Sequence, residues 1–200
     1  MKPKALTSSS NTAEPTVVKR HIKGLIKASF MCAITAILAY VTIPLPFSPV
    51  PITLQSLGVM LAGLVLGPSL GGWAMLVYLA LGLVGLPVFA GGTSGFTIIT
   101  GPTGGYILGF LPGAWLTGAL SQSILKTTMK NTKPGPFAAH LISSLVGGIG
   151  VVHLLGIFHL AQSTGLSFAQ AALMGTAPFL PGDIFKAVAA SILASKIKST

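Results

Sequence analysis

Long apolar runs, separated by prolines, glycines and small polar residues, fill most of this 200-residue chain. A helix that crosses the hydrocarbon core of a bilayer needs about 20 mostly apolar residues, and clustered prolines or glycines end such helices. Breaks in the apolar pattern therefore predict six spanning helices, of which the second is short. The expected spans are about Ile22–Ile43, Ile52–Leu66, Ser69–Leu86, Pro102–Leu125, Phe137–Gln162 and Ala177–Ser195.

Charged side chains are almost absent from the interior of the chain. The 98 residues from Ala28 to Leu125 contain no Lys, Arg, Asp, Glu or His, and the 49 residues from Pro134 to Gly182 contain only histidines as ionisable side chains. Soluble proteins are about 25% charged, whereas this chain is 7% charged and has a mean hydropathy of +0.84. These values exclude a soluble protein. They predict one all-α integral membrane domain at residues 21–200, after a disordered cytoplasmic tail at residues 1–20.

The basic residues flank the apolar runs and predict the orientation of the protein. They gather before the first span, between the fourth and fifth spans, and at the C-terminus. Cytoplasmic loops carry an excess of Lys and Arg, and six spans with both termini cytoplasmic place every basic residue except Lys186 inside. We therefore expect a multi-pass protein of the cell inner or plasma membrane. The pI of about 10.1 then reflects topology and contact with membrane lipid rather than binding to nucleic acid.

One pair of charges breaks this pattern near the outer end of the sixth span. Asp183 is the only aspartate of the chain, and Lys186 follows three residues later, on the same face of a helix. Pro178 and Pro181 favour a helix start just before Asp183, where the helix dipole stabilises a negative charge. A charge inside a bilayer costs about 2.5–3.5 kcal/mol on insertion scales, so such residues are functional candidates. The pair is either a polar anchor for a ligand or an ion pair that only neutralises itself.

Four motifs, in order along the chain, resemble one family. They are Pro44–Gln55 (PLPFSPVPITLQ), Gly85–Gly92 (GLPVFAGG), Gly101–Tyr106 (GPTGGY) and Pro181–Lys186 (PGDIFK). Together they are similar to the BioY family, the biotin-specific substrate-binding subunits (S components) of energy-coupling factor (ECF) transporters. The resemblance implies a six-helix membrane protein that captures biotin at the outer face and delivers it across the membrane. It also implies a transmembrane coupling subunit and two ATPase subunits as partners. Some members of the family act without them, so a solitary biotin transporter is an alternative.

The resemblance also implies roles for individual residues. Asp183 and Lys186 would bind the polar head of biotin, which carries two ureido N–H donors and a carbonyl acceptor. Further candidates lie near the expected outer mouth. Those for the apolar wall of the site are Phe47, Phe89 and Tyr106, and those for secondary hydrogen bonds are Thr53, Gln55, Thr93 and Ser94.

Small residues four apart on the first helix meet the coupling subunit in members of this family. Ala28, Cys32 and Ala36 have that spacing here, and the alternative is that they pack within this chain. The chain has no G-x-x-x-x-G-K-[ST] motif, so ATP would bind only to partner subunits. Its single cysteine leaves no cysteine-based metal cluster. We expect no enzyme activity, no catalytic residue, no cofactor and no metal.

Two other functions are open. An S component for another vitamin, such as thiamine or riboflavin, would be expected to stack its larger aromatic ligand on tryptophans. Trp73 and Trp115 fall toward opposite ends of their spans, which argues against it. A rhomboid-like intramembrane serine protease is suggested by the GTSG string around Ser94, with His153 or His159 as its base. Each histidine is also explained as a helix-contact residue whose N–H is bonded to a neighbouring carbonyl.

Overall fold

The computed structural model describes residues 14–131 and 135–199, so most of the expected tail and part of the basic loop lie outside it. The described elements, in chain order, are α1 (Glu14–Ala39), β1 (Thr42–Leu45), β2 (Ser48–Thr53), α2 (Gln55–Leu83), the 3-10 turn η1 (Ala90–Gly92), α3 (Phe96–Thr100), α4 (Gly104–Asn131), α5 (Pro136–Ser143), the π-helical segment η2 (Ser144–Val151), α6 (Val152–Thr164), α7 (Phe168–Gly175) and α8 (Leu180–Ser199). Helices therefore dominate the described chain, as the apolar pattern predicts.

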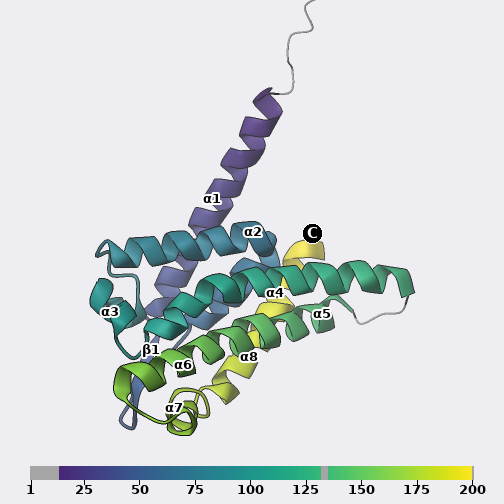
Figure 1. The fold of residues 1–200 in the computed structure, drawn as a ribbon. Coiled ribbons are helices and arrows are strands. Elements are labelled where there is room, and N and C mark those ends of the chain that lie inside the picture. The colour runs from purple at the N-terminus through teal and green to yellow at the C-terminus, as the bar shows by residue number, and fades with distance from the viewer. Residues whose placement is uncertain (1–13, 132–134, 200) are drawn as a thin grey trace, which may run out of the picture.

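The first helix is longer than expected. α1 begins at Glu14, ahead of the expected start at Ile22, and its N-terminal part extends beyond the other helices (Figure 1). Large apolar side chains of this helix remain exposed, including Leu25, Ile26 and Phe30. Exposed apolar surface of this kind suits contact with lipid tails or with another protein.

α2 is a helical hairpin rather than a straight rod. Gly67 interrupts it with a φ of 81° and a ψ of −179°, and Pro68 follows. A Cβ on Gly71 would lie 2.8 Å from the carbonyl oxygen of Ala62, although nine residues along a straight helix span about 13.5 Å. The chain therefore reverses at Gly67, where only glycine adopts the positive φ without strain. The break expected between the second and third spans is confirmed.

The remaining helices follow the expected apolar runs. α5, η2 and α6 form one continuous helix over Pro136–Thr164. α8 begins near the expected prolines and is preceded by α7, which lies in the stretch expected to be an outer loop. By length and apolar character, three helices among the described residues can cross a membrane, and a fourth can if α7 and α8, bent by 57°, form one broken span. The three are His21–Ala39, Pro136–Thr164 and Gln55–Leu83, the last counted by its whole length across the reversal at Gly67.

The short elements gather at one end of the bundle, away from the C-terminus (Figure 1). They include β1 and β2, an antiparallel hairpin in which Thr42 pairs with Thr53 and Ile43 with Ile52. This hairpin corrects the all-α expectation, because clustered prolines predict the end of a helix but not the strands that follow it. A two-stranded ribbon has two free edges, where a residue without an N–H breaks no ladder bond.

Candidate functional site

A pocket lies at this end of the molecule, between the β-hairpin and the ends of the helices. Residues from β2, α2, η1, α4, α6 and α8 meet there, so segments far apart in sequence share one cavity. Its lining residues are Val50, Pro51, Thr53, Gln55, Ser56, Ala90, Thr103, Tyr106, Ile107, Phe110, Val152, His153, Phe179, Asp183 and Lys186. The walls are mainly apolar, and the polar groups converge from α2, α6 and α8. Small-molecule sites have this composition.

The ion pair expected from sequence is formed and buried. Lys186 Nζ donates to Asp183 Oδ1 at 2.7 Å, and both residues lie in α8. They are 6% and 4% exposed, respectively. Ser56 of α2 completes a triangle, because its hydroxyl accepts from Lys186 Nζ at 3.1 Å and donates to Asp183 Oδ1 at 2.9 Å. The pair therefore has a polar neighbour 127 residues away from Asp183 in sequence.

His153 holds the other oxygen of the carboxylate. Its Nε2 lies 2.8 Å from Asp183 Oδ2, and its Nδ1 lies 3.0 Å from the hydroxyl oxygen of Thr176. The imidazole ring is edge-on to Tyr106, with centroids 5.6 Å apart and an interplanar angle of 87°. The hydroxyl of Tyr106 in turn donates to the carbonyl of Gly175 at 2.7 Å. Asp183 is thus held by α2, α6 and its own helix.

The cluster has hydrogen-bonding capacity left over. A carboxylate has about four acceptor positions and an ammonium three donors. Among the described residues, Asp183 accepts from Lys186, Ser56 and His153, so one position remains, on Oδ2. Lys186 donates to Asp183 and Ser56, so one N–H remains. Both residues line the pocket, so the cluster has one acceptor and one donor position that a ligand there could use.

Three of the other expected site residues also line the pocket. Thr53 and Gln55 are hydrogen-bonded to one another at 3.0 Å, and Gln55 also donates to the hydroxyl of Tyr78. Tyr106 contributes its ring to the wall beside His153. Thr53, Gln55 and Tyr106 therefore line the same pocket as Asp183 and Lys186.

The other four expected site residues do not line the pocket. Phe47, at the tip of the β-hairpin, is 57% exposed, whereas Phe89 is fully buried. The ring of Phe89 packs against Gly82 and lies edge-on to Tyr78, which in turn is hydrogen-bonded to the pocket residue Gln55. Thr93 is exposed and bonds the carbonyl of Ala90, and Ser94 lies next to it in the same loop. The order of these residues along the chain could not show which of them turn inward.

The small-residue stripe of α1 faces inward. Ala28 is 4% exposed and Cys32 is 3% exposed, both in the hydrophobic core, and Ala36 packs against that core. α1 makes its main contacts with α2. This placement favours the alternative that these residues pack within the chain.

Two members of the cluster were not expected as ligand-site residues. Ser56 follows the expected Gln55, and a lone serine beside it carries no signal of its own. The sequence predicts His153 as a helix-contact residue and does not point to a contact with Asp183. His153 lies 30 residues before Asp183 and on a different helix, so the sequence does not show their contact. The available signal was that it is one of only three histidines in a charge-poor stretch.

The fold and the pocket define a class of protein: a helical membrane protein with a small-molecule pocket at one end. Comparison with known proteins gives the family. The model of the BioY family matches residues 8–200, and this chain belongs to that family. Similar proteins include the biotin transporters BioY of Rhizobium etli, 40% identical over 84% of this chain and 89% of that one, and of Rhodobacter capsulatus, 42% identical over 84% and 88%. Among solved structures, the S-component for biotin from an ECF-type ABC transporter is 33% identical, with a TM-score of 0.82, and the match covers 91% of this chain and 94% of that one.

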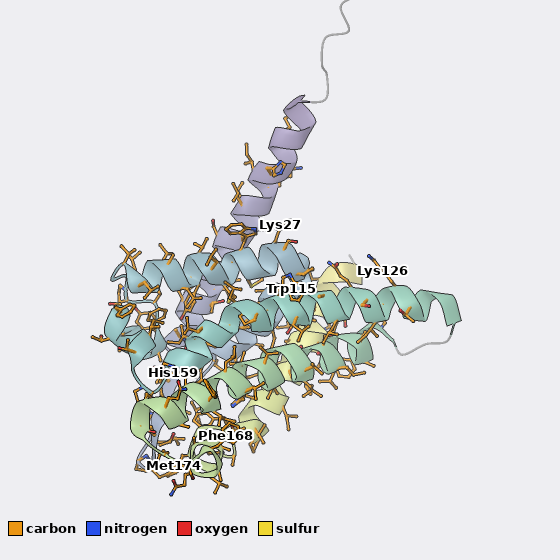
Figure 2. All side chains as sticks on the ribbon, viewed as in Figure 1. Lys27, Trp115, Lys126, His159, Phe168 and Met174 are labelled. Carbon is orange, nitrogen blue, oxygen red and sulfur yellow. The ribbon has the colours of Figure 1, made fainter. Side chains whose placement is uncertain are left out.

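These findings set aside the protease. The family is one of transport proteins, so the protein is not an enzyme. The geometry agrees: both ring nitrogens of His153 bond to Asp183 and Thr176, and Nε2 of His159 donates to the carbonyl of Gly101 at 3.1 Å. The expectation that His159 is a helix-contact residue bonded to a carbonyl is confirmed. Figure 2 shows His159 at the same end of the molecule as Phe168 and Met174, with Lys27 and Lys126 away from that end.

Proposed function

We propose that this protein is the biotin-binding S component of an ECF transporter and that Asp183 and Lys186 bind the ureido ring of biotin. The observation that carries the proposal is the open acceptor on Asp183 beside the open donor on Lys186. A cyclic urea presents an N–H donor next to a carbonyl acceptor, so one edge of its ring satisfies both groups at once. An ion pair that only neutralised itself would not need to line a pocket.

The rest of the pocket suits the rest of biotin. Tyr106, Ile107, Phe110 and Phe179 offer apolar surface to the fused rings, and Thr53 and Gln55 offer hydrogen bonds at the edge of the pocket. Phe47, Thr93 and Ser94 remain candidates only if the loops close over a bound ligand. A larger aromatic vitamin has less support, because Trp73 and Trp115 are 60% and 51% exposed and neither lines the pocket.

The proposal includes six spans with both termini cytoplasmic in the cell inner or plasma membrane. The break in α2 supports counting its two arms as two spans. The other four spans are α1, α4, the continuous helix over Pro136–Thr164, and α8. The pocket then opens outward. We further propose a coupling subunit and two ATPases as partners. Because Ala28 and Cys32 are buried, their use at that interface would require α1 to move relative to α2.

Equilibrium binding of biotin to the purified chain tests the function. The parent protein is expected to bind biotin, and Asp183→Asn and Lys186→Ala are each expected to weaken binding by at least about tenfold, the effect of losing a charge-assisted hydrogen bond. Lys126→Ala, which removes an exposed lysine on α4, is the matched control and should bind as the parent does. A parent that binds no biotin contradicts the function. Tight binding by both site variants contradicts the site.

Labelling with a membrane-impermeant maleimide tests the orientation in intact cells. The background is Cys32→Ala, which removes the only cysteine. Ala169→Cys in α7 should react from outside, and Thr127→Cys in α4 should react only after the cells are opened; both positions are exposed in the structure. The reverse pattern would overturn the orientation without affecting the biotin site. Uptake of biotin by cells that lack the ATPase subunits would favour the solitary transporter.

A further inference from the structure

His153 holds the Asp183 carboxylate at a point that no other described side chain holds. Lys186 and Ser56 both bond Oδ1, whereas His153 alone bonds Oδ2. When only one oxygen of a carboxylate is hydrogen-bonded, the position of the other oxygen is less well fixed. The second contact comes from α6, a different element, and therefore fixes the plane of the group.

We infer that His153 is the positioning and specificity-determining residue of this site: it orients Asp183 so that the one open position on Oδ2 meets a ligand N–H. The inference rests on the proposed function and goes beyond it, because His153 acts through Asp183. By taking one of the two positions on Oδ2, His153 leaves room for a single donor. Ligands that present an oxygen acceptor there are then disfavoured, since two acceptors face each other.

The surroundings of His153 fix its tautomer and its ring plane. An ionised carboxylate only accepts, so Nε2 carries the proton that points at Asp183. In the neutral ring Nδ1 then accepts from the hydroxyl of Thr176. The ring is bracketed by Tyr106 and by Phe179, whose centroid lies 6.3 Å away. The titratable groups that face it are Asp183, Lys186 and the Tyr106 phenol.

Two substitutions separate positioning from packing. The amide nitrogen of glutamine reaches about as far as Nε2 of histidine, and that of asparagine about as far as Nδ1. His153→Gln can therefore keep the donor to Asp183, whereas His153→Asn keeps only the contact toward Thr176. We expect His153→Gln to bind biotin within about threefold of the parent and His153→Asn to bind about 10- to 100-fold more weakly. Equal losses in both variants, or parent-like binding by His153→Asn, would overturn the inference.

A thermodynamic cycle that combines the His153 variants with altered ligands gives a readout that a purely structural role would not change. In the two cyclic carbamate analogues of biotin, oxygen replaces one or the other ureido N–H. The analogue that binds the parent more weakly marks the N–H that meets Asp183. Its penalty relative to biotin should shrink at least about threefold in His153→Asn, because the two changes remove parts of one contact. Full additivity would overturn the inference.

Two checks keep the outcomes distinct. Thermal unfolding of each variant in detergent reports on folding. If His153→Asn does not fold, Thr176→Val, which frees the tautomer but keeps the imidazole, replaces it in the cycle and should reduce the same penalty. An unchanged penalty in Thr176→Val then counts against the inference. If the parent itself binds no biotin, the proposed function fails.

Discussion

The hydroxyl of Ser56, in the first arm of α2, lies 3.1 Å from Lys186 Nζ in α8 and links the two members of the buried ion pair from a second helix. It accepts from the cation and donates to the anion, a role that a hydroxyl can fill and a methyl group cannot. The contact keeps Lys186 within reach of Asp183 while leaving one ammonium N–H open.

Ser56→Ala should therefore weaken biotin binding modestly. The change removes one donor to Asp183 and one acceptor from Lys186 but leaves the ion pair in place. We expect a loss of about 3- to 10-fold in affinity by equilibrium binding, in the range of one or two ordinary hydrogen bonds. Ser123→Ala, at an exposed position of α4, is the control. A loss as large as that of Asp183→Asn would mean that Ser56 contacts the ligand itself.

Removing one charge of the ion pair should cost more stability than removing both. Lys186→Met leaves the carboxylate of Asp183 buried without its cation, which costs about 3–5 kcal/mol when a buried pair is broken. The double variant Asp183→Asn with Lys186→Met leaves no isolated charge and should unfold at a higher temperature than Lys186→Met alone. Thermal unfolding in detergent measures the order. Biotin binding should be lost in both, and retained binding in the double variant would contradict the proposed site.

Tyr78 ties the two arms of α2 to the loop that follows. Its hydroxyl accepts from Gln55 Nε2 and donates to the carbonyl of Val88 at 2.6 Å, and the side chain is fully buried. Tyr78→Phe leaves both partners unsatisfied, so we expect a loss of about 1–3 kcal/mol in the free energy of unfolding. Tyr40→Phe also removes one bond, to the carbonyl of Pro87, but at a position that is 58% exposed, and should cost less. Equal losses of unfolding free energy in the two variants would argue against a stabilising role for the hydrogen bonds of Tyr78.

Glycine contacts set the distance between α4 and α6. A Cβ on Gly105 would overlap Cβ of His159 and the backbone oxygen of Leu155. Because that oxygen belongs to the backbone, α6 must move, and Gly105→Ala should destabilise the protein by about 1–3 kcal/mol. Gly182→Ala is the control: nothing lies within 4 Å of an added Cβ there, although Gly182 is next to Asp183. Unfolding temperatures compare the two, and a smaller loss in Gly105→Ala than in Gly182→Ala would refute the packing argument.

The sequence could predict where charge and helix ends would fall, because those follow from local chemistry. Asp183 and Lys186 stand out as a charge pair in an apolar segment, and Gly67-Pro68 marks a break without any knowledge of the neighbouring helices. The strands that contain Pro44, Pro49 and Pro51 were missed, since these residues predict only the end of a helix. Their pairing depends on the chain reversing at the two-residue loop between the strands.

The sequence does not show which side chains of the motifs point into the pocket. Phe47 and Phe89 both occur in motifs near the pocket, yet one is exposed and the other is packed behind Tyr78. His153 and Asp183 meet because the continuous helix of α5, η2 and α6 packs beside α8. Spacing on one helix predicts neighbours three or four residues apart. Contacts between helices depend on tertiary structure.

The short first arm of α2 bears on how a water-soluble vitamin could reach charges inside a membrane protein. From Gln55 to Leu66 the arm rises only about 18 Å at 1.5 Å per residue, less than the hydrocarbon thickness of about 30 Å. Such hydrophobic mismatch is met by local thinning of the bilayer. The pocket begins where this arm begins, at Gln55 and Ser56. If this arm is one of the six proposed spans, headgroups and water would come closer to the ion pair, and the ligand would not have to pass through lipid tails.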